Sequence, residues 1–170
     1  MIKVGIIGVG TVGTSVAEIL RDNADVISAR AGVDIVVKRG VVKNLNKDRG
    51  LDIVLSDNVD DILNDEEIDI VVELMGGVEE AFEVVKKALR AGKAVVTANK
   101  ALLAYHRYEL QAIAKDVAFE YEASVAGGIP IINALRDGLS ANHIESIMGI
   151  MNGTSNYMIT KMTNDGANYH

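Results

Sequence analysis

Residues 2–13 read Ile-Lys-Val-Gly-Ile-Ile-Gly-Val-Gly-Thr-Val-Gly, a short apolar strand that runs directly into the motif Gly8-x-Gly10-x-x-Gly13. Glycine at these places permits a tight turn, a close approach of the backbone to a pyrophosphate, and close packing of the following helix. The N–H groups at the start of that helix would face the anion. A helical apolar pattern follows, at Val12, Val16, Ile19 and Leu20. The segment therefore predicts a dinucleotide-binding turn, with an ordinary glycine-rich strand–helix turn as the alternative.

The composition bounds the class of protein. The 170 residues carry a net charge of −7, 49% apolar residues and no cysteine. The acidic balance argues against a nucleic-acid partner, because the phosphate backbone favours a basic face. The lack of cysteine excludes disulfides and thiolate metal sites. No apolar run reaches the roughly 18 residues that a membrane span needs, and no signal peptide is visible. We therefore expect a cytoplasmic protein with no membrane or nucleic-acid partner.

Apolar runs alternate with helical patterns along most of the chain, which is typical of a parallel sheet with crossover helices. We expect strands near residues 2–7, 34–42, 68–74, 94–98 and 118–125. We expect helices near residues 59–64, 79–91 and 105–115. Gly92 stands where the helix over 79–91 needs a C-cap. The pattern predicts an α/β fold, a Rossmann-type doubly wound parallel sheet, with residues 1–128 as the NAD(P)-binding domain.

The pattern changes at Ala-Gly-Gly-Ile-Pro (126–130), which holds the single proline of the chain. Proline is well placed in the first turn of a helix, so we expect a helix there, then a strand near 144–151 and a last helix from about residue 155. Two helices and one strand bury too little apolar surface to fold alone. We therefore expect residues 129–170 to be the truncated start of a second, α+β domain, and the chain to be a fragment.

The end of the second expected strand bears on the choice of cofactor. Domains that take NAD place an acid there, which hydrogen-bonds the ribose 2′-hydroxyl. This strand instead ends in Val-Val-Lys-Asn (41–44), with Lys47 and Arg49 nearby. A cation such as Lys43 could pair with the 2′-phosphate of NADP, so the sequence favours NADP over NAD. The alternative is that Lys43 only lines a solvated loop.

Two further polar residues lie near the carboxyl ends of expected strands, where ligands bind in open parallel sheets. Lys100 could polarise a carbonyl or hold a carboxylate beside the nicotinamide; the alternative is a surface lysine at a helix start. Glu122 precedes a glycine-rich turn, which would bring a carboxylate and several carbonyl oxygens together as a hard-cation site. Its alternative is a solvated acid.

Several segments together resemble the N-terminal part of homoserine dehydrogenases. They are Gly-Val-Gly-Thr-Val-Gly (8–13), Val-Val-Glu-Leu-Met-Gly-Gly (71–77), Thr-Ala-Asn-Lys-Ala-Leu-Leu-Ala (97–104), Glu-Ala-Ser-Val-Ala-Gly-Gly-Ile-Pro (122–130) and Gly-Ile-Met-Asn-Gly-Thr-Ser-Asn-Tyr (149–157). The first segment is shared by many dehydrogenases, whereas Ala-Asn-Lys and Asn-Gly-Thr-Ser-Asn-Tyr are far more specific. The resemblance implies NAD(P)-dependent interconversion of homoserine and aspartate 4-semialdehyde, on the route to threonine and methionine.

The resemblance also implies roles for individual residues. The cofactor would be bound by Gly8, Gly10, Thr11, Val12, Gly13, Lys43, Gly76, Gly77 and Lys100. Lys100 would in addition support hydride transfer as the catalytic residue. A sodium ion would be ligated by Glu122 and by the backbone carbonyls of Val125, Gly127 and Ile129.

In this family a second catalytic lysine and the carboxylates that bind the substrate amine lie past residue 170. The fragment is thus expected to bind cofactor and to be catalytically incomplete, and the full-length protein to form a homodimer through the second, substrate-binding domain. Another Rossmann dehydrogenase and a non-enzymatic NADP-binding module are the alternatives.

Overall fold

The computed structural model describes residues 1–150 and 152–169. The chain divides into two compact units, Met1–Ile129 and Pro130–His170, called here the first and the second unit. None of the helices in the described part of the chain is long and apolar enough to cross a membrane.

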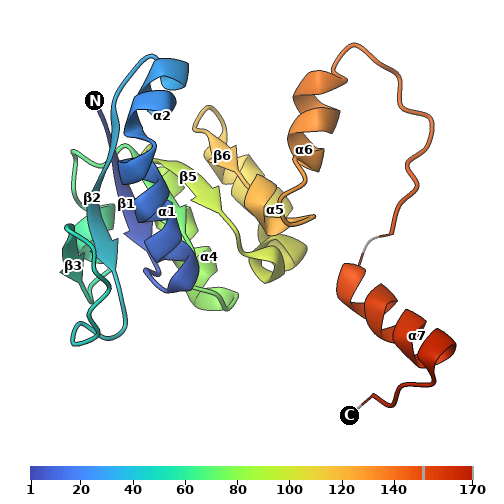
Figure 1. The fold of residues 1–170 in the computed structure, drawn as a ribbon. Coiled ribbons are helices and arrows are strands. Elements are labelled where there is room, and N and C mark those ends of the chain that lie inside the picture. The colour runs from blue at the N-terminus through green and yellow to red at the C-terminus, as the bar shows by residue number, and fades with distance from the viewer. Residues whose placement is uncertain (151, 170) are drawn as a thin grey trace. The chain divides into compact units, whose positions relative to one another are not determined.

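The centre of the first unit is a parallel sheet (Figure 1). Within the described residues it has six strands in the order β3-β2-β1-β4-β5-β6. The strands are β1 (Ile2–Ile7), β2 (Ile35–Val41), β3 (Val54–Ser56), β4 (Ile70–Glu73), β5 (Ala94–Thr97) and β6 (Phe119–Glu120). The strand order reverses between β1 and β4, which is where ligands bind in sheets of this type. The predicted doubly wound α/β fold is confirmed.

Helices cover both faces of this sheet. They are α1 (Thr11–Asp22), α2 (Ala24–Ala31), α3 (Asp60–Leu63), α4 (Glu79–Arg90) and α5 (Lys100–Ala114). Because neighbouring strand residues point to opposite faces, β4 sends Val72 to a core that includes Ala17 of α1, and Val71 to a core that includes Val85 of α4 and Leu110 of α5. The two layers fix the carboxyl ends of β1, β4 and β5 at one edge of the sheet.

Some local predictions for the first unit were wrong. The strand predicted over 118–125 is only the two residues of β6, and a 3₁₀-helix, η1 (Glu122–Ser124), takes its place. β3 and α2 were not predicted from the sequence, and α5 begins at Lys100, five residues before the predicted start at 105. The signal for the true start was Asn99, whose side-chain oxygen accepts the Leu102 N–H at 3.0 Å as an N-cap.

The described residues of the second unit hold α6 (Ile131–Asn133), a π-helix, η2 (Ala134–Gly138), and α7 (Gly153–Asp165). Asn152 caps α7 through its side chain, so the predicted last helix is confirmed. The strand predicted over 144–151 is wrong for residues 144–150, which form no regular structure; residue 151 lies outside the described residues. Met148 is 93% exposed, and an apolar segment forms a strand only where another strand supplies hydrogen-bond partners.

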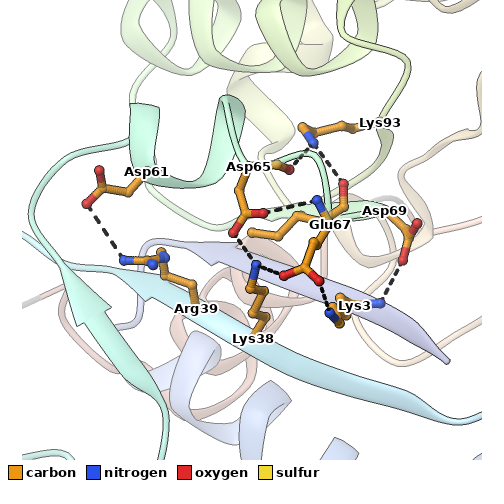
Figure 2. A network of polar contacts seen from close by, with 9 residues as sticks. Lys3, Lys38, Arg39, Asp61, Asp65, Glu67, Asp69 and Lys93 are labelled. Carbon is orange, nitrogen blue, oxygen red and sulfur yellow. Dashed lines mark hydrogen bonds and ion pairs between the residues drawn. The ribbon is translucent and has the colours of Figure 1, made fainter.

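Ion pairs hold the loop before β4 at the amino-terminal side of the sheet (Figure 2). Lys38 of β2 pairs with Asp65 and Glu67, each at 2.6 Å, and Lys3 of β1 pairs with Glu67 at 2.6 Å. Lys93 donates to the carbonyl oxygens of Asp65 and Ile68 at 2.6 and 2.8 Å. The hydrogen bond from Lys38 lowers the pKa of Asp65, and those from Lys3 and Lys38 lower the pKa of Glu67. The network ties β1, β2 and Lys93, the residue before β5, to one loop, far along the strands from their carboxyl ends.

Lys38→Met is expected to make the free energy of unfolding depend less steeply on pH in the acid range. A carboxyl whose pKa is lowered by folding stabilises the fold above its unfolded pKa, and this contribution is lost as the pH falls through the folded pKa. Asp65 and Glu67 both shift in that direction, so the unmodified chain should lose stability steeply below about pH 4.5, and the variant less so. Urea unfolding at a series of pH values measures this. Lys87→Met, an exposed lysine on α4, is the control, and equal slopes for Lys38→Met and the unmodified chain would contradict the prediction.

Candidate functional site

The glycine-rich turn leaves the end of β1 and leads into α1. Gly8 and Val9 donate their N–H groups to the carbonyl of Val41, at 3.0 and 3.1 Å, so the turn is fastened to the end of β2. The first turn of α1 has no capping side chain and no acidic residue. Its N–H groups and the positive end of its dipole are therefore available to an anion.

The structure gives a different reason for glycine at each of the three positions of the motif. Gly8 has a φ of +100°, and a Cβ there would lie 2.5 Å from the carbonyl oxygen of Leu74. A Cβ at Gly13 would lie 2.5 Å from the carbonyl oxygen of Gly8. A Cβ at Gly10 would meet nothing within 4 Å. The fold thus requires glycine at positions 8 and 13. At position 10 the fold itself does not require glycine, and the missing side chain leaves space for a ligand.

A cleft of about 340 Å³ opens beside this turn. It lies at the carboxyl ends of β1, β2 and β4, and its lining includes Gly8, Gly10, Lys43, Arg49 and Met75. The volume is in the range of small-molecule sites. The structure therefore brings three of the predicted cofactor residues, Gly8, Gly10 and Lys43, to one cleft.

Arg49 also lines the cleft, where the sequence had indicated only a cation near the end of the second strand. Its Nε donates to the carbonyl of Val9 at 2.8 Å, and its Nη1 donates to the carbonyls of Asn44 and Lys47 at 3.0 and 2.7 Å. These acceptors are neutral, so the positive charge of the guanidinium persists beside exposed Lys43. From the sequence, an arginine in a polar loop that lines a cleft cannot be distinguished from one that is only exposed to solvent.

The ends of β4 and β5 carry a buried polar network. Glu73, the last residue of β4, is completely buried and accepts the Met75 N–H at 2.9 Å and the Thr97 hydroxyl at 2.5 Å. The Thr97 oxygen in turn accepts the Asn99 N–H at 3.0 Å. The Asn99 side chain donates to the carbonyl of Gly77 at 2.7 Å. We call these three side chains, Glu73, Thr97 and Asn99, the strand-end network.

Lys100 follows this network directly, as the first residue of α5. It is exposed, and no carboxylate of the described residues pairs with it. A cation at a helix N-terminus is electrostatically disfavoured by the helix dipole, so the position gains nothing in stability from the charge. Gly76 and Gly77 lie in the loop after β4, both with positive φ, and neither lines the cleft.

The predicted cation ligands follow one another along η1 and the turn after it. Glu122 begins η1, and its carbonyl accepts the Val125 N–H at 3.3 Å. Gly127 has a φ of +60°, and the Ile129 N–H donates to the carbonyl of Ala126 at 3.2 Å. Among the described residues no group of three or more His, Cys, Asp or Glu side chains is arranged to hold a metal. The predicted sodium site would contain only one such side chain, because its other ligands are backbone carbonyls, so this finding does not test it.

The sheet order, the glycine turn and the cleft at the switch point together define a Rossmann-type dinucleotide-binding domain. A family model described as "Homoserine dehydrogenase, NAD binding domain" matches residues 8–123, and one described as "Homoserine dehydrogenase" matches residues 130–170. The chain belongs to the homoserine dehydrogenase family.

Individual relatives agree with this assignment. A homoserine dehydrogenase of Helicobacter pylori is 53% identical over 168 residues, covering 99% of this chain and 40% of the relative. The crystal structure of a homoserine dehydrogenase from Thiobacillus denitrificans superposes with a TM-score of 0.91 at 51% identity, over 98% of this chain and 39% of that one. A hyperthermophilic archaeal homoserine dehydrogenase in complex with NADPH superposes with a TM-score of 0.65 at 26% identity, over 79% of this chain and 47% of that one. The chain thus spans about two fifths of the length of the curated relatives it matches.

Proposed function

We propose that the protein to which this chain belongs is an NAD(P)-dependent oxidoreductase that interconverts homoserine and aspartate 4-semialdehyde, and that this chain supplies its cofactor-binding part. The observation that carries the proposal is the open space at Gly10, beside the uncapped start of α1 and within the cleft. A Cβ at Gly10 would meet no atom of the chain within 4 Å, so this space is where we expect the pyrophosphate. We assign residues 1–128 to the cofactor domain and residues 129–170 to the start of a substrate and dimerisation domain.

NADP is the cofactor that the cleft favours. Lys43 and Arg49 line it at the end of β2, where the ribose of the adenosine half belongs. The 2′-phosphate of NADP would meet two cations there, whereas an NAD-selecting acid is missing from the strand end. The NADPH-bound archaeal relative supports the same choice.

The proposed chemistry places Lys100 on the nicotinamide side of the switch point. The cofactor, when bound, supplies or accepts the hydride. Lys100 would hold its ammonium near the oxygen of the substrate, where negative charge develops as an aldehyde is reduced, and preorganised cations at such a position are a large source of rate enhancement. Gly76 and Gly77 would leave the loop after β4 free of side chains beside the nicotinamide ribose. Thr11, Val12 and Gly13 would bind the pyrophosphate through their N–H groups.

Lys43→Glu is expected to reverse the cofactor preference of this chain. NADP should raise the melting temperature of the unmodified chain more than NAD does, because a cation pairs with the 2′-phosphate. In the variant the carboxylate repels that phosphate and can accept a hydrogen bond from the 2′-hydroxyl of NAD. Thermal melts with each cofactor measure the order. Lys47→Glu makes the same charge change in the same loop but away from the cleft lining, and an unchanged order in Lys43→Glu would remove Lys43 from the ribose site.

The activity itself is tested with the full-length gene product. Oxidation of homoserine, followed at the nicotinamide absorbance with NADP and with NAD, should proceed above background. No rate with either cofactor would remove the proposed reaction; tight cofactor binding without a rate would instead indicate a cofactor-binding module.

Three expectations remain predictions. The sodium ion at Glu122, Val125, Gly127 and Ile129 and the homodimer of the full-length protein are implied by the resemblance, and the cytoplasmic location is expected from the composition. The family matches and the NADPH-bound relative support a nucleotide cofactor, and they do not extend to the sodium ion.

A further inference from the structure

The buried carboxylate of Glu73 is unusual for the core of a sheet. It is completely buried and accepts hydrogen bonds from neutral donors, the Met75 N–H and the Thr97 hydroxyl. Within the described residues it forms no ion pair. Burying an acid without a cation is costly, and an apolar residue would suit the rest of β4, which reads Ile-Val-Val before it.

The strand-end network instead anchors the loop after β4 at two points. Glu73 holds the loop at Met75 N–H, and Asn99 holds it at the Gly77 carbonyl. Gly76, between the two anchors, is exposed and has a φ of +73°. The network therefore fixes a loop that carries no side chain at its tip.

The same network sets the start of α5. Thr97 joins the two halves by donating to Glu73 and accepting from the Asn99 N–H. Asn99 then caps α5 through Leu102 N–H, and Lys100 is the next residue. The positions of the loop tip and of Lys100 thus both depend on hydrogen bonds that lead back to Glu73, although the loop follows β4 and Lys100 follows β5.

The position of this network relative to the switch point indicates what it serves. The adenosine half of a dinucleotide lies over β2, and the nicotinamide half lies across the switch point, over β4 and β5. Glu73 and Thr97 are paired residues at the carboxyl ends of β4 and β5. We propose that Glu73, Thr97 and Asn99 are positioning residues that preorganise the Met75–Gly77 loop and Lys100 for the nicotinamide half of the cofactor. This inference rests on the proposed function.

The test compares two probes on this chain. NADPH carries both halves of the cofactor, whereas 2′,5′-ADP carries only the adenosine half. Asn99→Ser keeps an N-cap oxygen for α5, because serine and asparagine cap about equally well, but removes the donor to the Gly77 carbonyl. The variant is expected to raise the dissociation constant of NADPH about tenfold and to leave that of 2′,5′-ADP within about twofold. Asn152→Ser, the same change at the N-cap of α7, is the matched control and should change neither.

A second pair of variants tests the buried centre of the network. Thr97→Val removes the hydroxyl at nearly constant volume and should weaken NADPH binding selectively, as Asn99→Ser does. Thr97→Ser retains the hydroxyl and should restore NADPH affinity. Binding is measured below the melting temperature of each variant, so that loss of folding is not read as loss of affinity.

The outcomes separate this inference from the proposed function. Equal weakening of both probes would mean that the network only supports the fold, and unchanged NADPH affinity in Asn99→Ser and Thr97→Val would mean that it positions nothing; either result overturns the inference while leaving the proposed function intact. An unmodified chain that binds neither probe would overturn the proposed function, and the inference with it.

Discussion

Gly10→Ala should weaken binding of NADPH by at least about tenfold, which corresponds to roughly 1.4 kcal/mol. A Cβ at Gly10 meets nothing within 4 Å of the chain itself, so the methyl group projects where the pyrophosphate is expected against the start of α1. The same change should alter the free energy of unfolding by less than about 1 kcal/mol, because the residue is an N-cap that another residue can occupy. Titration of NADPH fluorescence and urea unfolding measure the two effects.

Gly13→Ala provides the opposite case within the same motif. Its Cβ would lie 2.5 Å from the Gly8 carbonyl oxygen, so this variant is expected to lose about 1–3 kcal/mol of stability through overpacking. Gly138→Ala, at an open glycine of the second unit, should change neither quantity. If Gly10→Ala bound NADPH as tightly as the unmodified chain, the glycine turn would not be the pyrophosphate site.

Lys100→Met is expected to lower the turnover of homoserine by the full-length gene product by at least about 100-fold. The lysine has no carboxylate partner among the described residues, and its charge lies at the unfavourable end of a helix dipole. Its removal should therefore not lower the melting temperature. Cofactor affinity should change much less than turnover, because the ammonium acts on the developing negative charge of the substrate oxygen.

Lys115→Met is the control for Lys100→Met, because it removes an exposed lysine at the opposite end of α5. Steady-state kinetics for both variants, with homoserine and cofactor varied separately, separate turnover from binding. A Lys100→Met enzyme with ordinary turnover would show that another group handles the charge on the oxygen.

The order of elements in the first unit could be predicted because its signals are local and strong. The turn after β1 is indicated by three glycines at fixed spacing, and the buried strands are indicated by runs of valine and isoleucine. β3 is an edge strand of three residues, too short for any periodicity to reveal. The other edge strand, β6, was predicted, but it has only two residues because η1 follows it directly. The strand expected over 144–151 failed for a different reason: residues 144–150 have strand-like composition, but strand formation requires a partner that composition does not specify.

The candidate site could be predicted only in part. Gly8, Gly10 and Lys43 follow from the motif and the strand end, and they line one cleft. The strand-end network could not be predicted, since an acid at the end of an apolar run is usually solvated; its meaning depends on Thr97 being the register partner of Glu73 on the adjacent strand. Arg49 was expected only as a nearby cation; its contacts could not be predicted because its partners are main-chain oxygens of the glycine turn and of the loop after β2, which a sequence pattern does not encode.

The ion pairs before β4 have a consequence for how this domain can diverge. Lys3, Lys38 and Lys93 hold the amino-terminal side of the sheet, while the residues proposed to select the cofactor, Lys43 and Arg49, line the cleft at the opposite rim. Charge substitutions near the ribose therefore leave the electrostatic fastening of the strands intact. Selectivity between the two nicotinamide cofactors can therefore change, by evolution or by engineering, without compensating substitutions in these ion pairs.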